Sequence, residues 1–173
     1  MSTEVTIVAG GPSLRGFDFT QLTGDIIAIN YAAICIPQAT YCYFANKSWF
    51  DRFEHELRVH RGRKIQGWGD GVEKVAKPWV EVYRFVEGRI SMTPRTLCPG
   101  ANSGYAAVNL AVLLGYKQLT LLGYDFLDSD ATANFHDTHT WTNPQPQEWR
   151  RTWNKYMVPA LAELGIEIKM GAV

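Results

Sequence analysis

The sequence predicts an α/β fold, with a Rossmann-like, mostly parallel sheet and helices on both of its faces. Three observations lead to this prediction. Short apolar runs rich in β-branched residues recur along the chain, several of them end at a glycine or a polar residue, and segments with helical spacing separate them. Strands that alternate with helices build a parallel sheet covered on both faces. The chain of 173 residues is expected to form a single domain over residues 1–173.

The first part of the chain predicts three strands and one helix. Residues 5–9 form a β-branched run that ends at a glycine turn, and residues 25–30 repeat this pattern and end at an asparagine. Residues 41–44 are the third strand. Apolar residues at helical spacing predict a helix over 48–57, which an asparagine or a serine is placed to cap.

The second part predicts the rest of the sheet. Strand patterns are weaker at 64–66 and 80–85, between glycine-rich and proline-rich stretches. Residues 103–114 form a small-residue helix that ends at a glycine, because glycine adopts the left-handed backbone of a helix end. A buried strand over 118–122 follows. The final helix, over 147–164, carries aromatic residues on one face, and an edge strand at 166–169 completes the sheet.

The composition excludes several classes of protein. With 46% hydrophobic and 20% charged residues, the chain can bury a core and is not disordered. Its 17 basic residues balance 17 acidic ones, which argues against binding nucleic acid through a large basic surface. Cys35, Cys42 and Cys98 show no C-x-x-C spacing, so we expect reduced thiols rather than disulfides or a zinc site, in a cytoplasmic protein. We expect neither a signal peptide nor a membrane span.

Glycine and polar residues follow the predicted strands at three places. In parallel sheets, ligands bind beyond the carboxyl ends of the strands, and the first turn of a helix offers unpaired N–H groups to a phosphate or carboxylate. Each turn alone is explained by ordinary turn and capping chemistry, and none fits the dinucleotide or ATP glycine motifs. Together they predict a pocket for a nucleotide or a phosphorylated sugar. Its residues are Gly10, Gly11, Pro12 and Ser13 after the first strand, Asn30 after the second, Asp125 after the strand at 118–122, and Asn102, Ser103 and Gly104 at a helix start.

The loop after Asp125 contains two of the four histidines, His136 and His139, with Asp137 between them. Histidine exchanges a proton near neutral pH, so the loop is a candidate for a catalytic acid or base. A metal site that includes the neighbouring aspartates, or a solvated polar loop, are the alternatives. We expect the loop to fold back over the strand ends.

Two further features indicate a surface for an acceptor. The basic run over residues 58–64 is suited to a polyanion, although such runs usually form a solvated face. Trp68 and Trp141, both expected in loops, are candidates to stack on a base or a sugar ring.

Several segments, in this order and spacing, resemble the bacterial lipooligosaccharide sialyltransferases. The same segments resemble a related group of small viral and bacterial proteins that are similar to 6-hydroxymethylpterin diphosphokinases. The matching segments are residues 7–14, 17–18, 30, 103–104, 114–117 and 122–126.

The resemblance implies a donor site and a base. In those sialyltransferases the glycine–proline–serine turn, the asparagine and the helix start hold the CMP part of the donor, and a loop histidine deprotonates the acceptor without a metal. This implies nucleotide contacts at Gly10 to Ser13, Asn30 and Asn102 to Gly104, with His136 or His139 as the base. Gly10 stands where the family usually has an asparagine, and the donor-phosphate tyrosines have no counterpart after Phe126.

The function that follows is a nucleotide-dependent, glycosyltransferase-like transferase, with a nucleotide-sugar donor and an acceptor that the sequence does not name. Its predicted catalytic residues are His136, His139, Asp125 and Asp137, and its leading mechanism uses no cofactor or metal. One alternative is an ATP-dependent phosphotransferase that resembles the diphosphokinases and in which carboxylates hold Mg²⁺. Another is a non-catalytic module that sequesters a nucleotide. An aromatic-rich surface is compatible with a homo-oligomer.

Overall fold

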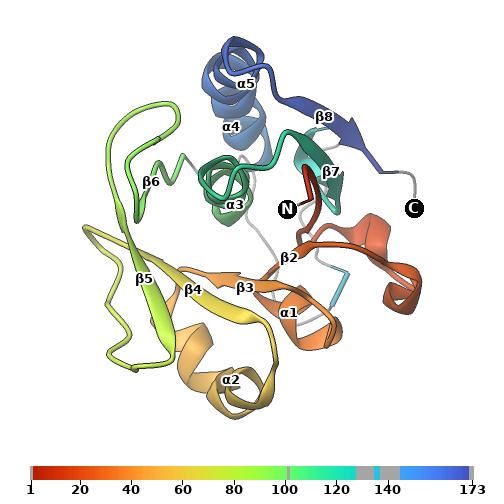
Figure 1. Cartoon of the computed structure of the whole chain (residues 1–173), viewed down its shortest axis with the longest axis vertical. Helices are drawn as coiled ribbons and strands as arrows, with labels where there is room; N and C mark the ends of the chain where they lie inside the picture. The colour runs from red at the N-terminus through yellow and green to blue at the C-terminus, as the bar shows by residue number, and fades with distance from the viewer. Residues whose placement is uncertain (1, 101, 128–134, 137–144, 172–173) are drawn as a thin grey trace.

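The computed structural model describes residues 2–100, 102–127, 135–136 and 145–171. Within them lies one sheet of eight strands in the order β6-β5-β4-β3-β2-β1-β7-β8, and every described pairing is parallel. Helices cover both of its faces (Figure 1). The predicted Rossmann-like α/β fold is confirmed. The strands are β1 (Glu4–Val8), β2 (Ile26–Ile29), β3 (Tyr41–Phe44), β4 (Arg63–Trp68), β5 (Val80–Phe85), β6 (Thr96–Leu97), β7 (Gln118–Leu122) and β8 (Glu167–Met170).

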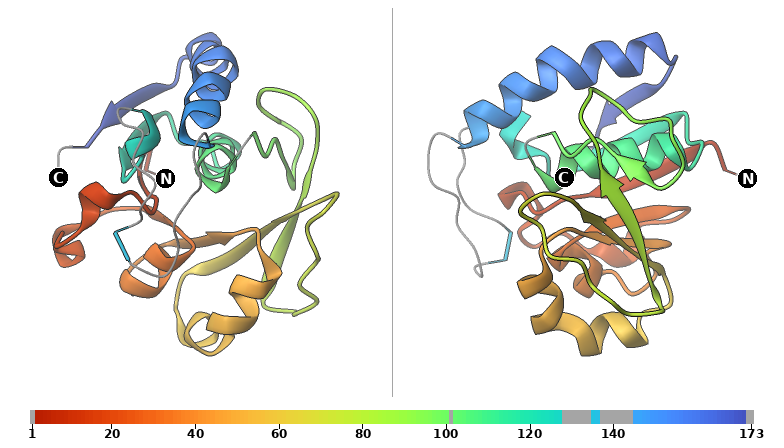
Figure 2. Two further views of the ribbon diagram at one scale, coloured as in Figure 1. Left: turned by 180° about the vertical axis from the view of Figure 1, so that it is seen from behind. Right: turned by 90° about the vertical axis from the view of Figure 1, so that its left-hand side faces the viewer.

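The helices divide between the two faces of the sheet. On one face, α3 and the C-terminal helix pack against a core that includes Ile7, Leu110 and Trp153. On the other, α1 and α2 enclose a second core around Ile26 and Phe50 (Figures 1 and 2). The helices are α1 (Tyr31–Cys35), α2 (Lys47–Val59), α3 (Ser103–Leu113), α4 (Gln145–Thr152) and α5 (Val158–Glu163), with the short helices η1 (Pro12–Leu14), η2 (Phe19–Gln21), η3 (Asp125–Leu127) and η4 (Trp153–Met157).

Successive strands are added on one side of β1 and then on its other side, and this reversal determines where the site lies. From β1 the chain adds β2, β3, β4, β5 and β6 on one side, and it returns through α3 to place β7 and β8 on the other. At such a reversal the connections after two neighbouring strands diverge to opposite faces and leave a crevice at the carboxyl ends. The turns that follow β1 and β7 therefore border the expected ligand crevice.

The C-terminal helix departs from the sequence prediction in its middle. Residues 153–157 form a π-helical segment, η4, in which the Val158 N–H donates to the Trp153 carbonyl. This wider turn precedes Pro159, which has no N–H to donate. The π-helical segment adds one residue to the turn and so rotates the helix. Met157 is therefore buried, whereas Tyr156, one of the aromatic residues expected on a single face, is 37% exposed. Figure 2 shows α4, η4 and α5 as one continuous rod.

Three smaller features complete the comparison with the sequence. Helix α1 and strand β6 were not predicted, because α1 continues an apolar run without visible periodicity and β6 has only two residues. The three cysteines are free, as expected. Among the described residues, no helix is long and apolar enough to cross a membrane.

Candidate functional site

The turn after β1 is held against the turn after β7. The backbone N–H of Gly11 donates to the Gly123 carbonyl at 2.9 Å. The Asp125 carboxylate accepts two hydrogen bonds from Ser13, one from the backbone N–H at 2.7 Å and one from the hydroxyl at 2.6 Å. These contacts join two predicted site segments that lie far apart in the sequence. They give Asp125 a positioning role, while its predicted catalytic role stays a prediction.

Glycine at position 11 is required by close packing rather than by backbone angles. Its φ of −63° suits any residue, yet a Cβ there would lie 2.3 Å from Asp125 Oδ2 and 2.5 Å from the Gly123 carbonyl oxygen. A side chain would therefore push the two turns apart. Pro12 then begins η1, where its fixed φ suits the first position of a helical turn.

Asn30, directly after β2, has a strained backbone. Its φ of 50° and ψ of −122° are rare for a residue with a side chain. The backbone is bonded on both sides, since the N–H donates to the Tyr43 carbonyl and the C=O accepts from Ala33 N–H. The side chain does not cap α1 and forms no hydrogen bond with the described residues. Strain of this kind costs about 1–3 kcal/mol and concentrates at functional sites, so the free amide of Asn30 is a candidate ligand group.

The start of α3 lies beside the turn after β7. The Asn102 side chain caps the helix by accepting from the Tyr105 N–H at 3.0 Å. The buried Gly104 packs on Tyr124, whose hydroxyl donates to the Gly104 carbonyl at 3.0 Å. A Cβ at Gly104 would come within 3.0 Å of the Tyr124 ring. Because the first N–H groups of a helix have no partner within the helix, Ser103 and Gly104 offer donors at this end of the sheet.

Part of the histidine loop lies over the end of β1, as predicted. The Phe135 N–H donates to the Gly10 carbonyl at 2.9 Å. The His136 ring lies 4.4 Å, centroid to centroid, from the Tyr31 ring. His136 is therefore placed near the turn after β1 and the start of α1. Asp137 and His139 lie outside the described residues, and their predicted roles stay predictions.

Two buried tyrosines border the site, and neither is suited to act as a base. Burial raises the pKa of Tyr124 far above its ordinary value, and nearby Tyr43 adds to the shift. Burial also raises the pKa of Tyr43, whose hydroxyl has no hydrogen-bond partner in the described structure. Both phenols stay protonated at neutral pH. His136 thus remains the candidate base in the described part of the site.

A metal site is not built from the described residues. No group of three or more histidine, cysteine, aspartate or glutamate side chains in that part of the chain is arranged to hold an ion. Of the loop residues suggested as metal ligands, only His136 belongs to the described part of the chain. The magnesium-dependent alternative therefore stays a prediction.

Sequence reasoning missed two features of this edge of the sheet. One is Tyr31, which contacts His136 and lies at the start of a helix that was not predicted. The other concerns Ser13, which was expected to contact a nucleotide and whose hydroxyl donates to Asp125. Ser13 and Asp125 are 112 residues apart, and no local pattern indicates such a contact.

Comparison with known proteins supports a similarity at the level of the fold. No protein-family model matches the sequence, and no curated protein matches it. Among solved structures, the chain is similar to the sialyltransferase CstII from Campylobacter jejuni, whose structure was determined in complex with a substrate analogue, cytidine-5′-monophosphate. The TM-score is 0.58 at 14% sequence identity, over 96% of this chain and 79% of the sialyltransferase. The match supports the Rossmann-like fold.

Proposed function

We propose, from a likeness in fold to a sialyltransferase studied with CMP, that this protein is a glycosyltransferase-like enzyme with a nucleotide-sugar donor. One observation carries the proposal. The turn after β1 is hydrogen-bonded to the turn after β7, which contacts the start of α3, and the strained Asn30 follows β2, the strand that pairs with β1. These segments lie at the carboxyl ends of strands beside the strand-order reversal, where an α/β sheet binds its ligand. A nucleotide is the ligand class that uses such backbone N–H groups, a helix start and a side-chain amide.

The proposed donor site works without a basic side chain at its centre. The Ser103 and Gly104 N–H groups and the positive end of the α3 dipole would face the donor phosphate. The Asn30 amide, free of partners within the described chain, would bind the nucleotide. Asp125 would keep the turn from Gly11 to Ser13 in place. This arrangement agrees with a net charge of zero.

The proposed reaction is the transfer of a sugar to a hydroxyl. His136 or His139 takes the proton of the acceptor hydroxyl, and the acceptor oxygen forms a bond to the anomeric carbon. The bond from that carbon to the phosphate oxygen breaks, and the nucleoside monophosphate leaves with the electron pair. The N–H groups of α3 stabilise the charge on the leaving phosphate.

Ligand titration tests the site itself. Isothermal calorimetry with CMP, UDP, ADP and ATP should show binding of at least one nucleotide, with CMP as the first probe. If none of the four binds, the nucleotide site is wrong. Chelation separates the alternatives, since a glycosyltransferase of this kind should keep its activity in EDTA whereas a magnesium-dependent phosphotransferase should lose it.

Single-histidine variants test the chemistry. His136→Ala and His139→Ala are compared with His55→Ala, which replaces an exposed histidine in α2. Release of CMP from a CMP-sugar should fall by about 100-fold or more in the variant that lacks the base, with nucleotide affinity largely kept, and His55→Ala should match the wild type. Equal turnover in all three variants and in the double variant contradicts the mechanism. An intact donor after long incubation with a protein that binds CMP supports a sequestering module instead.

A further inference from the structure

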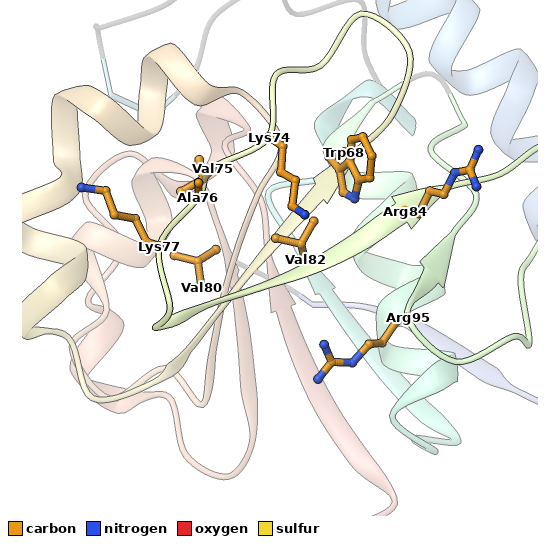
Figure 3. Close-up of a pocket in the computed structure, with 9 residues that line it drawn as sticks. All are labelled: Trp68, Lys74, Val75, Ala76, Lys77, Val80, Val82, Arg84 and Arg95. Carbon is orange, nitrogen blue, oxygen red and sulfur yellow. The ribbon is translucent and has the colours of Figure 1, made fainter.

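A basic hollow lies on the α2 face of the sheet, over β4 and β5. It encloses about 430 Å³, and its lining includes Trp68, Lys74, Lys77, Val82, Arg84 and Arg95 (Figure 3). Val80, Val82 and Arg84 alternate along β5 and share this face. Val80 is buried in the core beneath α2, whereas Val82 is half-buried and Arg84 exposed. The hollow therefore lies on the part of this face that α2 does not cover.

The lining carries positive charge that the nearby acids do not neutralise. Four of its nine residues are lysine or arginine, and none of these nine described residues is an acid. Lys77 pairs with Glu54 at 2.6 Å. Lys74, Arg84 and Arg95 form no ion pair with any residue that the structure describes. Glu81 attracts Arg95 electrostatically, although the two form no ion pair. A chain with no net charge therefore places three cations outside any described ion pair around this hollow.

Buried hydrogen bonds hold the rim of the hollow in place. Gln66, fully buried in β4, donates to the Glu73 carbonyl at 2.8 Å and accepts from the Val75 N–H at 2.8 Å. These bonds fix the backbone on both sides of Lys74. The Lys74 ammonium lies 5.4 Å from the centroid of the Trp68 ring. The backbone at the rim is therefore held in place by a buried side chain, Gln66, whose amide is fully hydrogen-bonded.

The two arginines enter from neighbouring strands. The Arg84 N–H donates to the Arg95 carbonyl at 2.9 Å, where β5 meets the start of β6. Figure 3 shows the side chains of Arg84 and Arg95 extending in different directions. Both residues belong to the lining of the hollow, so their cations are spaced apart around the apolar side chains of Trp68 and Val82. Such a lining suits a ligand that has spaced negative charges and apolar C–H faces. A carbohydrate chain that carries carboxylates or phosphates has both properties.

The position of the hollow connects it to the proposed donor site. Trp68 ends β4 at the edge of the sheet where Asn30 follows β2 and Gly10 follows β1. Three strand spacings separate β4 from β1, a distance of about 14 Å that a few sugar units can span. We infer that the basic hollow binds a negatively charged carbohydrate chain, which, if the proposed function holds, is the acceptor.

The test removes the three unpaired cations. The variant Lys74→Gln, Arg84→Gln, Arg95→Gln is compared with Arg58→Gln, Lys117→Gln, Lys169→Gln, which removes three exposed cations outside the hollow. The probes are a galacturonic acid hexamer, a mannose pentasaccharide phosphate, neutral maltohexaose and a ten-nucleotide thymidine DNA strand. Affinities are measured by calorimetry without donor, and thermal unfolding checks that both variants fold.

We expect at least one anionic saccharide to bind the wild type and maltohexaose not to bind. Affinity should fall about tenfold in the hollow variant and stay within about twofold in the control. The inference is overturned if neither anionic saccharide binds, if both variants bind equally, or if the DNA strand binds more tightly than both saccharides. Titration with CMP, UDP, ADP and ATP is the separate readout. If a saccharide binds but none of the four nucleotides does, the hollow is supported and the proposed function is wrong. If a nucleotide binds but no anionic saccharide does, only the inference about the hollow is wrong.

Discussion

Ser13 donates two hydrogen bonds to Asp125, from its backbone N–H at 2.7 Å and from its hydroxyl at 2.6 Å. The carboxylate thereby ties the turn after β1 to the turn after β7 at the point where the strand order reverses. A charged acceptor makes such hydrogen bonds stronger than neutral ones. The shape of the candidate site therefore depends on a residue that is not required to touch the ligand.

Asp125→Asn should weaken nucleotide binding. The substitution removes the charge and places an amide N–H₂ group against one of the two Ser13 donors. Because a hydrogen bond to a charged group contributes roughly 1.5–3 kcal/mol, we expect CMP affinity measured by calorimetry to fall about tenfold or more. Asp51→Asn is the matched control, since Asp51 pairs with Lys47 on α2. Equal affinity in the two variants would contradict the positioning role of Asp125.

Gly11→Ala should destabilise the protein through a clash. The new Cβ would lie 2.3 Å from Asp125 Oδ2, and overpacking of this kind costs about 1–3 kcal/mol of unfolding free energy. Gly115→Ala is the comparison, because its Cβ would meet open space and only its φ of 92° adds strain, of roughly 1–2 kcal/mol. Urea unfolding measures both. The clash is disproved if Gly11→Ala matches the wild type in stability and in CMP affinity.

Asn30→Gly should lower CMP affinity without lowering stability. Glycine relieves the strain at a φ of 50°, which offsets its own entropic cost of about 0.5–1 kcal/mol, so the free energy of unfolding should stay equal or rise. Removal of the amide should lower CMP affinity. Asn30→Asp keeps the shape but places a negative charge near the phosphate, and it should bind CMP more weakly still. Lower stability together with unchanged affinity would show that Asn30 is purely structural.

Glu81→Gln should destabilise the protein more at neutral pH than at acidic pH. The pKa of Glu81 lies below its ordinary value of 4.5, mainly because Arg63 donates hydrogen bonds to its carboxylate. A carboxyl with a lowered folded pKa adds stability above its unfolded pKa, and this stability is lost as the pH falls through the folded pKa. We expect a loss of about 0.5–1 kcal/mol at pH 7, since the pair is partly exposed, and a smaller loss near pH 3.

The control for this pH dependence is Glu163→Gln. Glu163 pairs with Arg89, and its pKa is lowered in the same direction by hydrogen bonds from that arginine. Both partners of this pair are more exposed to solvent than Glu81, so the effect of the substitution should be smaller. Urea unfolding at the two pH values measures both variants. A Glu81→Gln loss that is the same at pH 3 and pH 7 would rule out the ion pair as its cause.

Much of the fold could be predicted because strands and helices leave local patterns. The strands over 41–44, 80–85 and 118–122 begin and end at the residues that the sequence predicted. Helix α1 left no such pattern, since a five-residue helix after a buried strand shows no periodicity. The π-helical turn at Trp153 to Met157 was also missed, because it departs from the regular period that the prediction assumes.

The site was predictable in part for the same reason. Glycine and polar residues at strand ends identified the segments around Gly11, Asn30 and Gly104. The basic hollow was not predicted. Trp68, expected in a loop, ends β4, and the cations come from three separate segments of the chain. The basic run over residues 58–64 does not supply them, and in it Arg63 pairs with Glu81.

The sequence by itself determined the α/β class, the strand positions and the residues that follow the strands, because these depend on the chemistry of neighbouring residues. The tertiary structure decided which strands are neighbours, that Asp125 binds Ser13, and that Lys74, Arg84 and Arg95 border one hollow beside Trp68. Those relationships depend on strand order and on packing between distant segments. Local patterns carry little information about either.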